Sequence, residues 1–222
     1  MTADMKSTIA ANLSTIDDEI GKMCKHVGRE KANPRLIAVS KVQPEERIIA
    51  ALEAGHRIFG ENRVQEAQER WSDLRTSYTD LQLHLIGSLQ TNKAAEAVAL
   101  FDVIQSVDRP KLAKFLAREM ETQDRNLPVY IQVNTGEEAQ KGGCMAKDLP
   151  DLLKLCAELK LNVQGLMCIP PADEDPSLHF AFLKKLAKRH KLNGLSMGMS
   201  SDYALAASMG ATDIRVGTAI FG

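Results

Sequence analysis

The segment LIAVSKVQPEERIIAALEAGHRIF, residues 36–59, holds one complete strand–helix–strand unit. Its apolar run at residues 36–39 predicts a short buried strand, and Pro44 stops strand pairing soon afterwards. Residues 45–54 have apolar side chains at helical spacing, and residues 56–59 predict the next strand. Strands joined by a crossover helix lie parallel, so this unit indicates an α/β fold.

The same alternation continues along the whole chain. Runs of strand length predict eight strands, at residues 36–39, 56–59, 83–86, 103–107, 129–133, 163–169, 192–197 and 213–216. Helical spacing predicts helices between them, at residues 45–54, 63–74, 94–100, 110–121, 149–159, 178–190 and 201–209. On a chain of 222 residues this count predicts a single domain, residues 1–222, folded as a compact (β/α)8 TIM barrel. An open, doubly wound sheet is the alternative.

An additional helix is expected before the barrel. Apolar residues recur there at steps of three, four and seven, with acidic residues 17–19 between them. This spacing predicts an amphipathic N-terminal helix that packs on another element. Its apolar residues are Ile9, Leu13, Ile16, Ile20 and Val27.

The composition narrows the classes of partner. With 28 basic and 29 acidic residues, the chain has no global field to attract nucleic acid or an anionic membrane. No apolar run is long enough to span a bilayer and no signal-peptide pattern begins the chain, so a cytoplasmic location is expected. The four cysteines form no Cys-x-x-Cys pair and have no histidine at metal-ligand spacing, which predicts reduced thiols and no metal site.

Lys41 is the first candidate for chemistry, because it follows the strand at residues 36–39. In a barrel of this type the reactive residues lie at the carboxyl ends of the strands. Partial desolvation there disfavours the ammonium form, and a neutral amine can attack an aldehyde. Lys41 is therefore a candidate Schiff-base lysine, and the alternative is a loop lysine that points into water.

The last two strand ends predict a phosphate site. Ser200 and Ser201 open the predicted helix at residues 201–209, and Gly217 and Thr218 offer backbone N–H groups beside a hydroxyl. The N-terminus of the helix adds its partial positive charge, so a phosphate dianion could bind without a lysine or an arginine. The alternative is that Ser200 or Ser201 is an ordinary N-cap.

Three other polar residues each have two interpretations. Arg215, in the last predicted strand, forms either a core ion pair, for example with Glu61, or a contact with a ligand. Lys141, beside two glycines, either reaches a ligand or is solvated. His84 is flanked by leucines and is expected to be satisfied in the core rather than catalytic.

Taken together, these residues resemble a known family, the pyridoxal phosphate homeostasis proteins, which are similar to the N-terminal barrel of alanine racemase standing alone. The segment HLIGSLQTNK, residues 84–93, is the most specific match. The others are AVSK (38–41), FGEN (59–62), VQE (64–66), GLMCIP (165–170), LSMGMS (195–200) and RVGTAIFG (215–222). The match runs almost from end to end.

The resemblance implies a barrel that binds pyridoxal 5′-phosphate, with the cofactor aldehyde held as an imine on Lys41. It also implies that the phosphate lies near Ser200 and that Arg215 faces the pyridine nitrogen. Many members have a second lysine where this chain has Gln43, which puts a secondary site using that lysine in doubt. The expected cofactor-binding residues are Lys41, Asn62, Ser200, Arg215, Gly217 and Thr218.

The expected partner of the cofactor ring favours a carrier over an enzyme. Pyridoxal phosphate accelerates amino-acid chemistry by accepting carbanion charge into a protonated ring. Arginine only donates, so Arg215 would leave the ring unprotonated and the electron sink weak. We therefore expect a protein that holds or delivers the cofactor in intracellular pyridoxal phosphate homeostasis, without efficient catalysis.

Two alternatives to the carrier stay open, a slow amino-acid racemase and a Schiff-base aldolase that acts on a phosphorylated sugar without a cofactor. The expected partners of the carrier are pyridoxal phosphate and the apo forms of enzymes that use it. A monomer is expected, with no nucleic acid, membrane or metal as partner.

Overall fold

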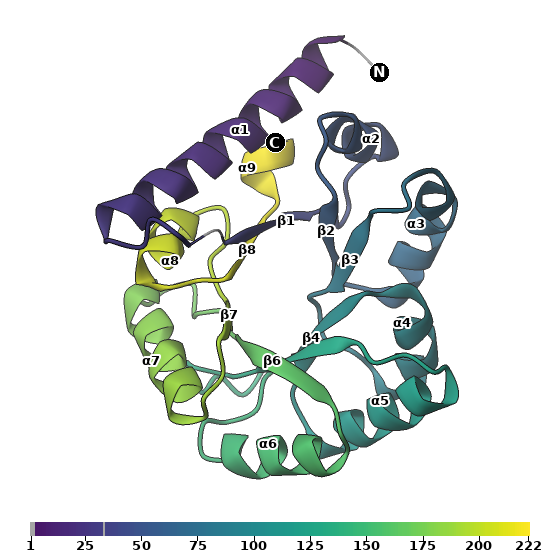
Figure 1. Cartoon of the computed structure of the whole chain (residues 1–222), viewed down its shortest axis with the longest axis vertical. Coiled ribbons are helices and arrows are strands. Elements are labelled where there is room, and N and C mark those ends of the chain that lie inside the picture. The colour runs from purple at the N-terminus through teal and green to yellow at the C-terminus, as the bar shows by residue number, and fades with distance from the viewer. Residues whose placement is uncertain (1–2, 33) are drawn as a thin grey trace.

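The computed structural model of the chain describes residues 3–32 and 34–222. Eight parallel strands form a closed barrel in the order β1 to β8, and β8 pairs with β1 (Figure 1). The predicted barrel is confirmed, and the open sheet is wrong. The strands are β1 (Arg35–Val39), β2 (Ile58–Glu61), β3 (Gln82–Leu85), β4 (Val103–Val107), β5 (Pro128–Gln132), β6 (Asn162–Met167), β7 (Gly194–Ser196) and β8 (Asp213–Val216).

Helices surround the barrel and cover its outer face (Figure 1). Each predicted helix overlaps an observed one, and α9 is an element that the sequence pattern does not predict. No helix in the described ranges has the length and apolar composition needed to cross a membrane. The helices are α1 (Ala3–His26), α2 (Glu45–Glu53), α3 (Val64–Ser77), α4 (Ala94–Leu100), α5 (Pro110–Thr122), α6 (Leu149–Glu158), α7 (Pro176–Arg189), α8 (Tyr203–Met209) and α9 (Thr218–Phe221), with the 3₁₀ turn η1 (Thr91–Lys93) before α4.

The additional N-terminal helix is also confirmed. α1 packs against α2, α8 and α9 on the side of the barrel where β1 meets β8 (Figure 1). Val27 lies beyond the last helical residue and is 43% exposed, so its predicted place on the apolar face is wrong. The apolar residues that α1 does bury are Ile9, Leu13, Ile16 and Ile20.

The predicted helix at residues 201–209 begins at Tyr203 instead of Ser201. Asp202 is its N-cap residue, and the Oδ1 atom of Asp202 accepts a hydrogen bond from the backbone N–H of Met199 at 2.6 Å. This contact closes a turn before the helix. Neither Ser200 nor Ser201 is therefore the N-cap of α8.

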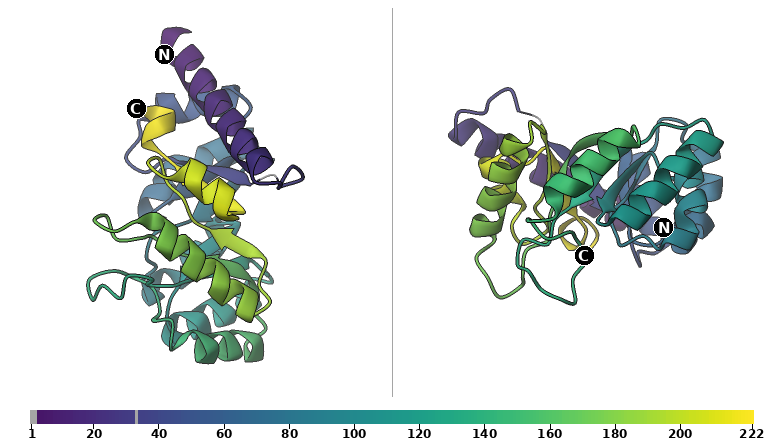
Figure 2. Two further views of the ribbon diagram at one scale, coloured as in Figure 1. Left: turned by 90° about the vertical axis from the view of Figure 1, so that its left-hand side faces the viewer. Right: turned by 90° about the horizontal axis from the view of Figure 1, so that it is seen from below.

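Strand register brings the ends of β1 and β8 together. Ala38 pairs with Val216, and Val39 pairs with Gly60 of β2. Because all eight strands are parallel, their carboxyl ends open on one side of the barrel, which we call the mouth. Figure 2 shows the loops after β5 and β6 extending beyond the barrel on the same side.

The turn after β1 has an unfavourable backbone conformation. Val42 has a φ angle of 55°, in the left-handed region that β-branched residues rarely adopt. Its side chain is 81% exposed, so packing does not compensate for this conformation. A hydrogen bond of 3.1 Å from the backbone N–H of Gln43 to the carbonyl of Ser40 closes the turn around Lys41. Strain is therefore stored beside Lys41.

We expect Val42→Asn to raise the free energy of unfolding by about 1 kcal/mol, because asparagine tolerates the left-handed region. The matched control is Val27→Asn, which replaces another exposed valine that lacks a positive φ. Urea denaturation of both variants and the wild type measures the difference. Equal effects of the two substitutions would contradict the proposed strain.

Candidate functional site

A cavity of about 600 Å³ lies at the mouth of the barrel. All six predicted cofactor-binding residues line it, although they come from four separate segments of the chain. A second hollow, of about 570 Å³ between α5 and α6, contains none of them. The lining residues are Val39, Lys41, Asn62, Ile86, Gly87, Ser88, Gln132, Gln140, Lys141, Gly142, Ile169, Met199, Ser200, Ser201, Arg215, Gly217 and Thr218.

Lys41 lines this cavity from the turn after β1. The residue is exposed, so the predicted partial desolvation of its amine is wrong in this structure. The described part of the chain offers Nζ no hydrogen bond or ion pair. The amine is therefore free to react without first breaking a contact.

A buried carboxylate, that of Glu61, holds the residue before Lys41 in place. Oε1 of Glu61 accepts hydrogen bonds from Ser40 Oγ at 2.7 Å, Arg70 Nη1 at 2.7 Å and Trp71 Nε1 at 3.0 Å. Glu61 is fully buried, and Arg70 is its ion-pair partner. The predicted ion pair between Glu61 and Arg215 is therefore wrong, since α3 supplies the cation.

Arg215 is a buried cation without a carboxylate partner. It is 3% exposed, and burial lowers the pKa of its guanidinium. Nη1 donates to Ser196 Oγ, and Nη2 donates to the carbonyl oxygen of Cys168 at 2.8 Å. Asp213, on the same strand, pairs instead with Arg35 at 2.7 Å. Among the described residues no carboxylate lies within ion-pair distance of Arg215, so this cation can still accommodate an acceptor in the cavity.

Ser200 joins the loop after β7 to the start of α9. Its Oγ accepts hydrogen bonds from the backbone N–H groups of Gly217 and Ala219, at 3.3 Å each. Because Oγ is the acceptor in both contacts, its own hydrogen remains available to a ligand. The hydroxyls of Ser201 and Thr218 have no partner within residues 3–32 and 34–222. The donors of the predicted phosphate site are thus assembled, but by α9 and the loop and not by the N-terminus of α8.

Asn62 occupies the cavity wall at the end of β2. Its position depends on Gly87, because a Cβ atom at residue 87 would lie 2.2 Å from the carbonyl oxygen of Asn62. Only glycine permits this approach between the ends of β2 and β3. The side-chain amide of Asn62 has no hydrogen-bond partner in the described ranges and is free to contact a ligand.

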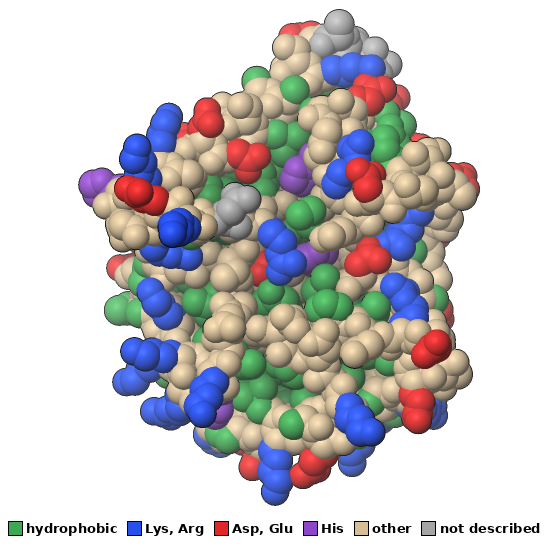
Figure 3. Space-filling model, in the orientation of Figure 1, with side chains coloured by type: hydrophobic (Ala, Val, Ile, Leu, Met, Phe, Trp, Pro, Cys, Tyr) green, Lys and Arg blue, Asp and Glu red, His purple; other side chains and the backbone are tan. Residues whose placement is uncertain are grey.

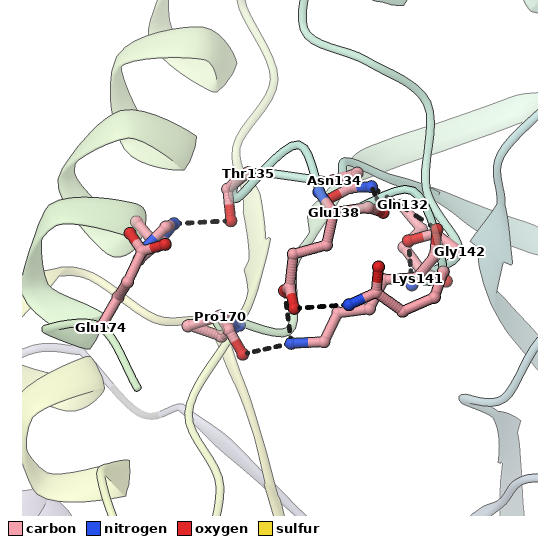
Figure 4. A network of polar contacts seen from close by, with 10 residues as sticks. Gln132, Asn134, Thr135, Glu138, Lys141, Gly142, Pro170 and Glu174 are labelled. Atoms are coloured by element: carbon pink, nitrogen blue, oxygen red, sulfur yellow. Dashed lines mark hydrogen bonds and ion pairs between the residues drawn. The ribbon is translucent and has the colours of Figure 1, made fainter. Parts of the chain in front are cut away.

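The loop after β5 closes one side of the cavity (Figure 4). Lys141 forms an ion pair with Glu138 at 2.6 Å and donates to the carbonyl oxygen of Pro170 at 3.2 Å. Gln132 Nε2 donates to the carbonyl oxygen of Gly142 at 3.1 Å, which ties the loop to β5. Lys141 thus lines the cavity but is held by protein contacts, unlike Lys41.

The charge of the cavity differs from that of the surface as a whole. Figure 3 shows basic and acidic side chains mixed on the face that it draws. The charged residues that line the cavity, within the part of the chain that the structure describes, are Lys41, Lys141 and Arg215. This cationic lining favours an anionic ligand.

The cysteines and His84 are structural. All four cysteines are buried as free thiols. Burial raises the pKa values of Cys144 and Cys168 to about 12 and that of Cys156 to about 11, so none is a ready nucleophile. His84 is fully buried, and its Nδ1 atom contacts Gln105, but Nε2 has no partner among the described residues, so the expectation of a satisfied core histidine holds for one ring nitrogen only.

Some lining residues were not among the predicted site residues. Ser88 and Met199 follow predicted strands, at residues 83–86 and 192–197, so their position at a strand end was the available signal. Ile86 and Gln140 carry no such signal, because an apolar residue after a strand and a loop glutamine are common. They enter the site through loop geometry alone.

Known proteins match this sequence over almost the whole chain. The family described as "Alanine racemase, N-terminal domain" matches residues 6–222. The pyridoxal phosphate homeostasis protein of Pseudomonas aeruginosa is 40% identical, and the alignment covers 97% of this chain and 96% of that protein. The protein of the same name from Haemophilus influenzae is 36% identical, with coverage of 96% and 95%.

Solved structures are also similar to this chain over almost its whole length. PipY of Synechococcus elongatus, solved with pyridoxal phosphate bound, has 38% identity and a TM-score of 0.82, and the match covers 96% of this chain and 100% of PipY. Alanine racemase of Clostridium difficile has a TM-score of 0.72 at 13% identity, covering 97% of this chain and 56% of the racemase, and shares the fold. The chain therefore belongs to the pyridoxal phosphate homeostasis protein family and carries the alanine racemase N-terminal domain.

Proposed function

We propose that this chain binds pyridoxal 5′-phosphate in the cavity at the mouth and holds it through Lys41, as a carrier that keeps the cofactor available. The observation that carries the proposal is that one cavity holds both a lysine amine and a buried arginine for which the described residues offer no ion-pair partner. Pyridoxal phosphate supplies an aldehyde that condenses with an amine and an aromatic ring that withdraws electrons.

The donor set of the cavity fits the parts of this cofactor. Lys41 offers an unpartnered amine for the aldehyde. Arg215 offers only donors, so it suits a ring nitrogen that carries no proton. Ser200 and Thr218 offer hydroxyl donors for the phosphate, and Gly217 lies beside them with its own N–H donating to Ser200 Oγ. The solved complex of PipY with pyridoxal phosphate, at 38% identity, supports binding of this cofactor by the chain.

The lining of the cavity supports a carrier over an enzyme. It contains no histidine, tyrosine, cysteine or carboxylate among the described residues, which leaves two lysines as groups able to accept a proton. One of them, Lys141, is held by Glu138. A racemase needs a proton acceptor on each face of the substrate, and this lining offers little beyond Lys41 itself.

Slow amino-acid racemisation is the second candidate, because the whole barrel matches the alanine racemase domain. The aldolase alternative is not retained, since the chain belongs to a family named for pyridoxal phosphate. For the carrier we propose a cytoplasmic monomer that delivers its cofactor to apo enzymes. An exposed Lys41 at an open mouth is compatible with such exchange.

We expect borohydride reduction of the cofactor-loaded protein, followed by peptide mapping, to place the pyridoxyl label on Lys41, because its amine has no competing contact. Lys41→Ala should lose the visible absorbance of the bound cofactor. The matched control, Lys141→Ala, changes the other lysine of the lining and should keep that absorbance. A label found reproducibly on Lys93 or Lys141 would show the assignment to be wrong.

We expect Ser200→Ala and Thr218→Val each to weaken cofactor binding about tenfold or more, because a hydrogen bond to a charged acceptor contributes roughly 1.5–3 kcal/mol. Absorbance titration of the apo protein measures the dissociation constant. Ser208→Ala is the control, since its hydroxyl bonds to the carbonyl of Leu205 within α8 and does not line the cavity. Unchanged affinity in both variants would remove the phosphate from these loops.

We expect the loaded wild type to exchange the α-protons of L-amino acids barely faster than free pyridoxal phosphate does. Mass spectrometry of a panel of amino acids incubated in deuterium oxide measures this exchange, normalised to bound cofactor. Stereoinversion at roughly 1 per second or faster would favour the racemase over the carrier.

A further inference from the structure

We propose that three buried side chains, His84, Gln105 and Ser196, form a hydrogen-bonded chain that positions Arg215 and holds its N–H groups toward the cavity. The inference rests on the proposed function, in which the cofactor ring accepts from Arg215. None of the three side chains lines the cavity, so they act through the arginine.

The chain of contacts crosses the interior of the barrel. Arg215 of β8 donates to Ser196 Oγ of β7, and Ser196 lies 2.6 Å from Oε1 of Gln105 in β4. Nε2 of Gln105 lies 2.9 Å from Nδ1 of His84 in β3. β4 and β7 are not neighbours in the sheet, so the link between Ser196 and Gln105 spans the barrel. The three positioning residues are all 0% exposed.

The directions of the hydrogen bonds follow from Arg215 and from the amide oxygen of Gln105. A guanidinium has donors only, so Ser196 Oγ accepts from it, and Oε1 of Gln105, which carries no hydrogen, accepts the hydrogen of that hydroxyl. Gln105 is thereby oriented with its NH₂ group toward His84, whose Nδ1 atom must accept. His84 is then a neutral imidazole with its proton on Nε2.

The surroundings of His84 agree with this assignment. Burial, followed by the nearby charge of Arg35, lowers the pKa of His84 to about 3, so the ring stays neutral at physiological pH. Its Nε2 atom is buried without a partner in the described part of the chain. An unpartnered N–H costs stability, and an apolar side chain would avoid that cost. A positioning role accounts for a polar residue there.

The hydrogen-bonded chain of His84, Gln105 and Ser196 determines which N–H groups Arg215 can offer to a ligand. With Nη1 held by Ser196 and Nη2 by the carbonyl of Cys168, the guanidinium plane is fixed from two sides. Its remaining N–H groups can then serve the cavity that Arg215 lines. Loss of Ser196 or Gln105 frees one side of the guanidinium and disturbs its hydrogen bond to the cofactor ring.

The test uses Ser196→Ala, Ser196→Thr and Gln105→Leu, with Ser106→Ala as the matched control. Ser106 is the next residue of β4 after Gln105, and its buried hydroxyl has no hydrogen-bond partner in the described ranges. We measure the dissociation constant of pyridoxal phosphate and the ¹⁵N chemical shift of its ring nitrogen in each loaded protein. Ser196→Ala and Gln105→Leu should weaken binding about tenfold and shift the ring nitrogen signal. Ser196→Thr keeps the hydroxyl and should restore both values, and Ser106→Ala should change neither.

A second measurement uses the cofactor-free wild type and does not depend on any variant folding. ¹⁵N-edited NMR of His84 should show a neutral ring with its proton on Nε2 throughout about pH 5 to 8. A proton on Nδ1 would reverse the direction of the hydrogen bond between His84 and Gln105 and overturn the inference.

The outcomes separate the two proposals. Equal ring-nitrogen shifts in Ser196→Ala and Ser106→Ala, with the wild type binding normally, would overturn the positioning role and leave the carrier intact. A wild type that binds no pyridoxal phosphate would overturn the proposed function and the inference together.

Discussion

The parallel pairing of β8 with β1 is the constraint on which the site depends. It joins residues 35–38 to residues 213–216 and so brings together chain segments that lie at nearly opposite ends of the sequence. Lys41 follows β1, and Gly217 and Thr218 follow β8, so closure of the barrel brings the amine beside the proposed phosphate donors. α1 covers this junction from outside, which shields the closing strands from solvent.

The second organising feature is the difference in partners between two buried charged residues of the barrel, Glu61 and Arg215. Glu61 has its cation, Arg70, and two neutral donors, so its desolvation is offset within the protein. Arg215 has a hydroxyl and a carbonyl but no carboxylate among the described residues. Neutral acceptors hold the guanidinium in place without neutralising it. Burial of this cation therefore lowers the stability of the fold, and its charge is available to a ligand.

The same contrast separates the two lysines of the cavity. Lys141 is held by Glu138 and Pro170 across the loops after β5 and β6, whereas Lys41 is exposed and has no partner within residues 3–32 and 34–222. In a carrier, a reactive amine at an open mouth allows the cofactor to enter and leave without a conformational change. An enzyme benefits from the opposite arrangement, a closed site that excludes water and carries a base on each side of its substrate.

Local sequence patterns were enough for the barrel and the N-terminal helix, because each strand and helix is specified by its own apolar period. The strand ends also marked Lys41, Ser200, Gly217 and Thr218, whereas the expected binding roles of Asn62 and Arg215 came from the family resemblance. The local patterns failed where turn geometry and contacts between elements decide. Asp202 bonds to Met199 in a turn and so delays the start of α8, Arg70 of α3 pairs with Glu61 of β2, and solvent reaches Lys41 in the turn after β1. The hydrogen bonds that link His84 to Arg215 could not be predicted from the sequence either. A hydrogen bond across the barrel depends on strand order and register, and the apolar period of a strand does not determine which inward side chains face each other.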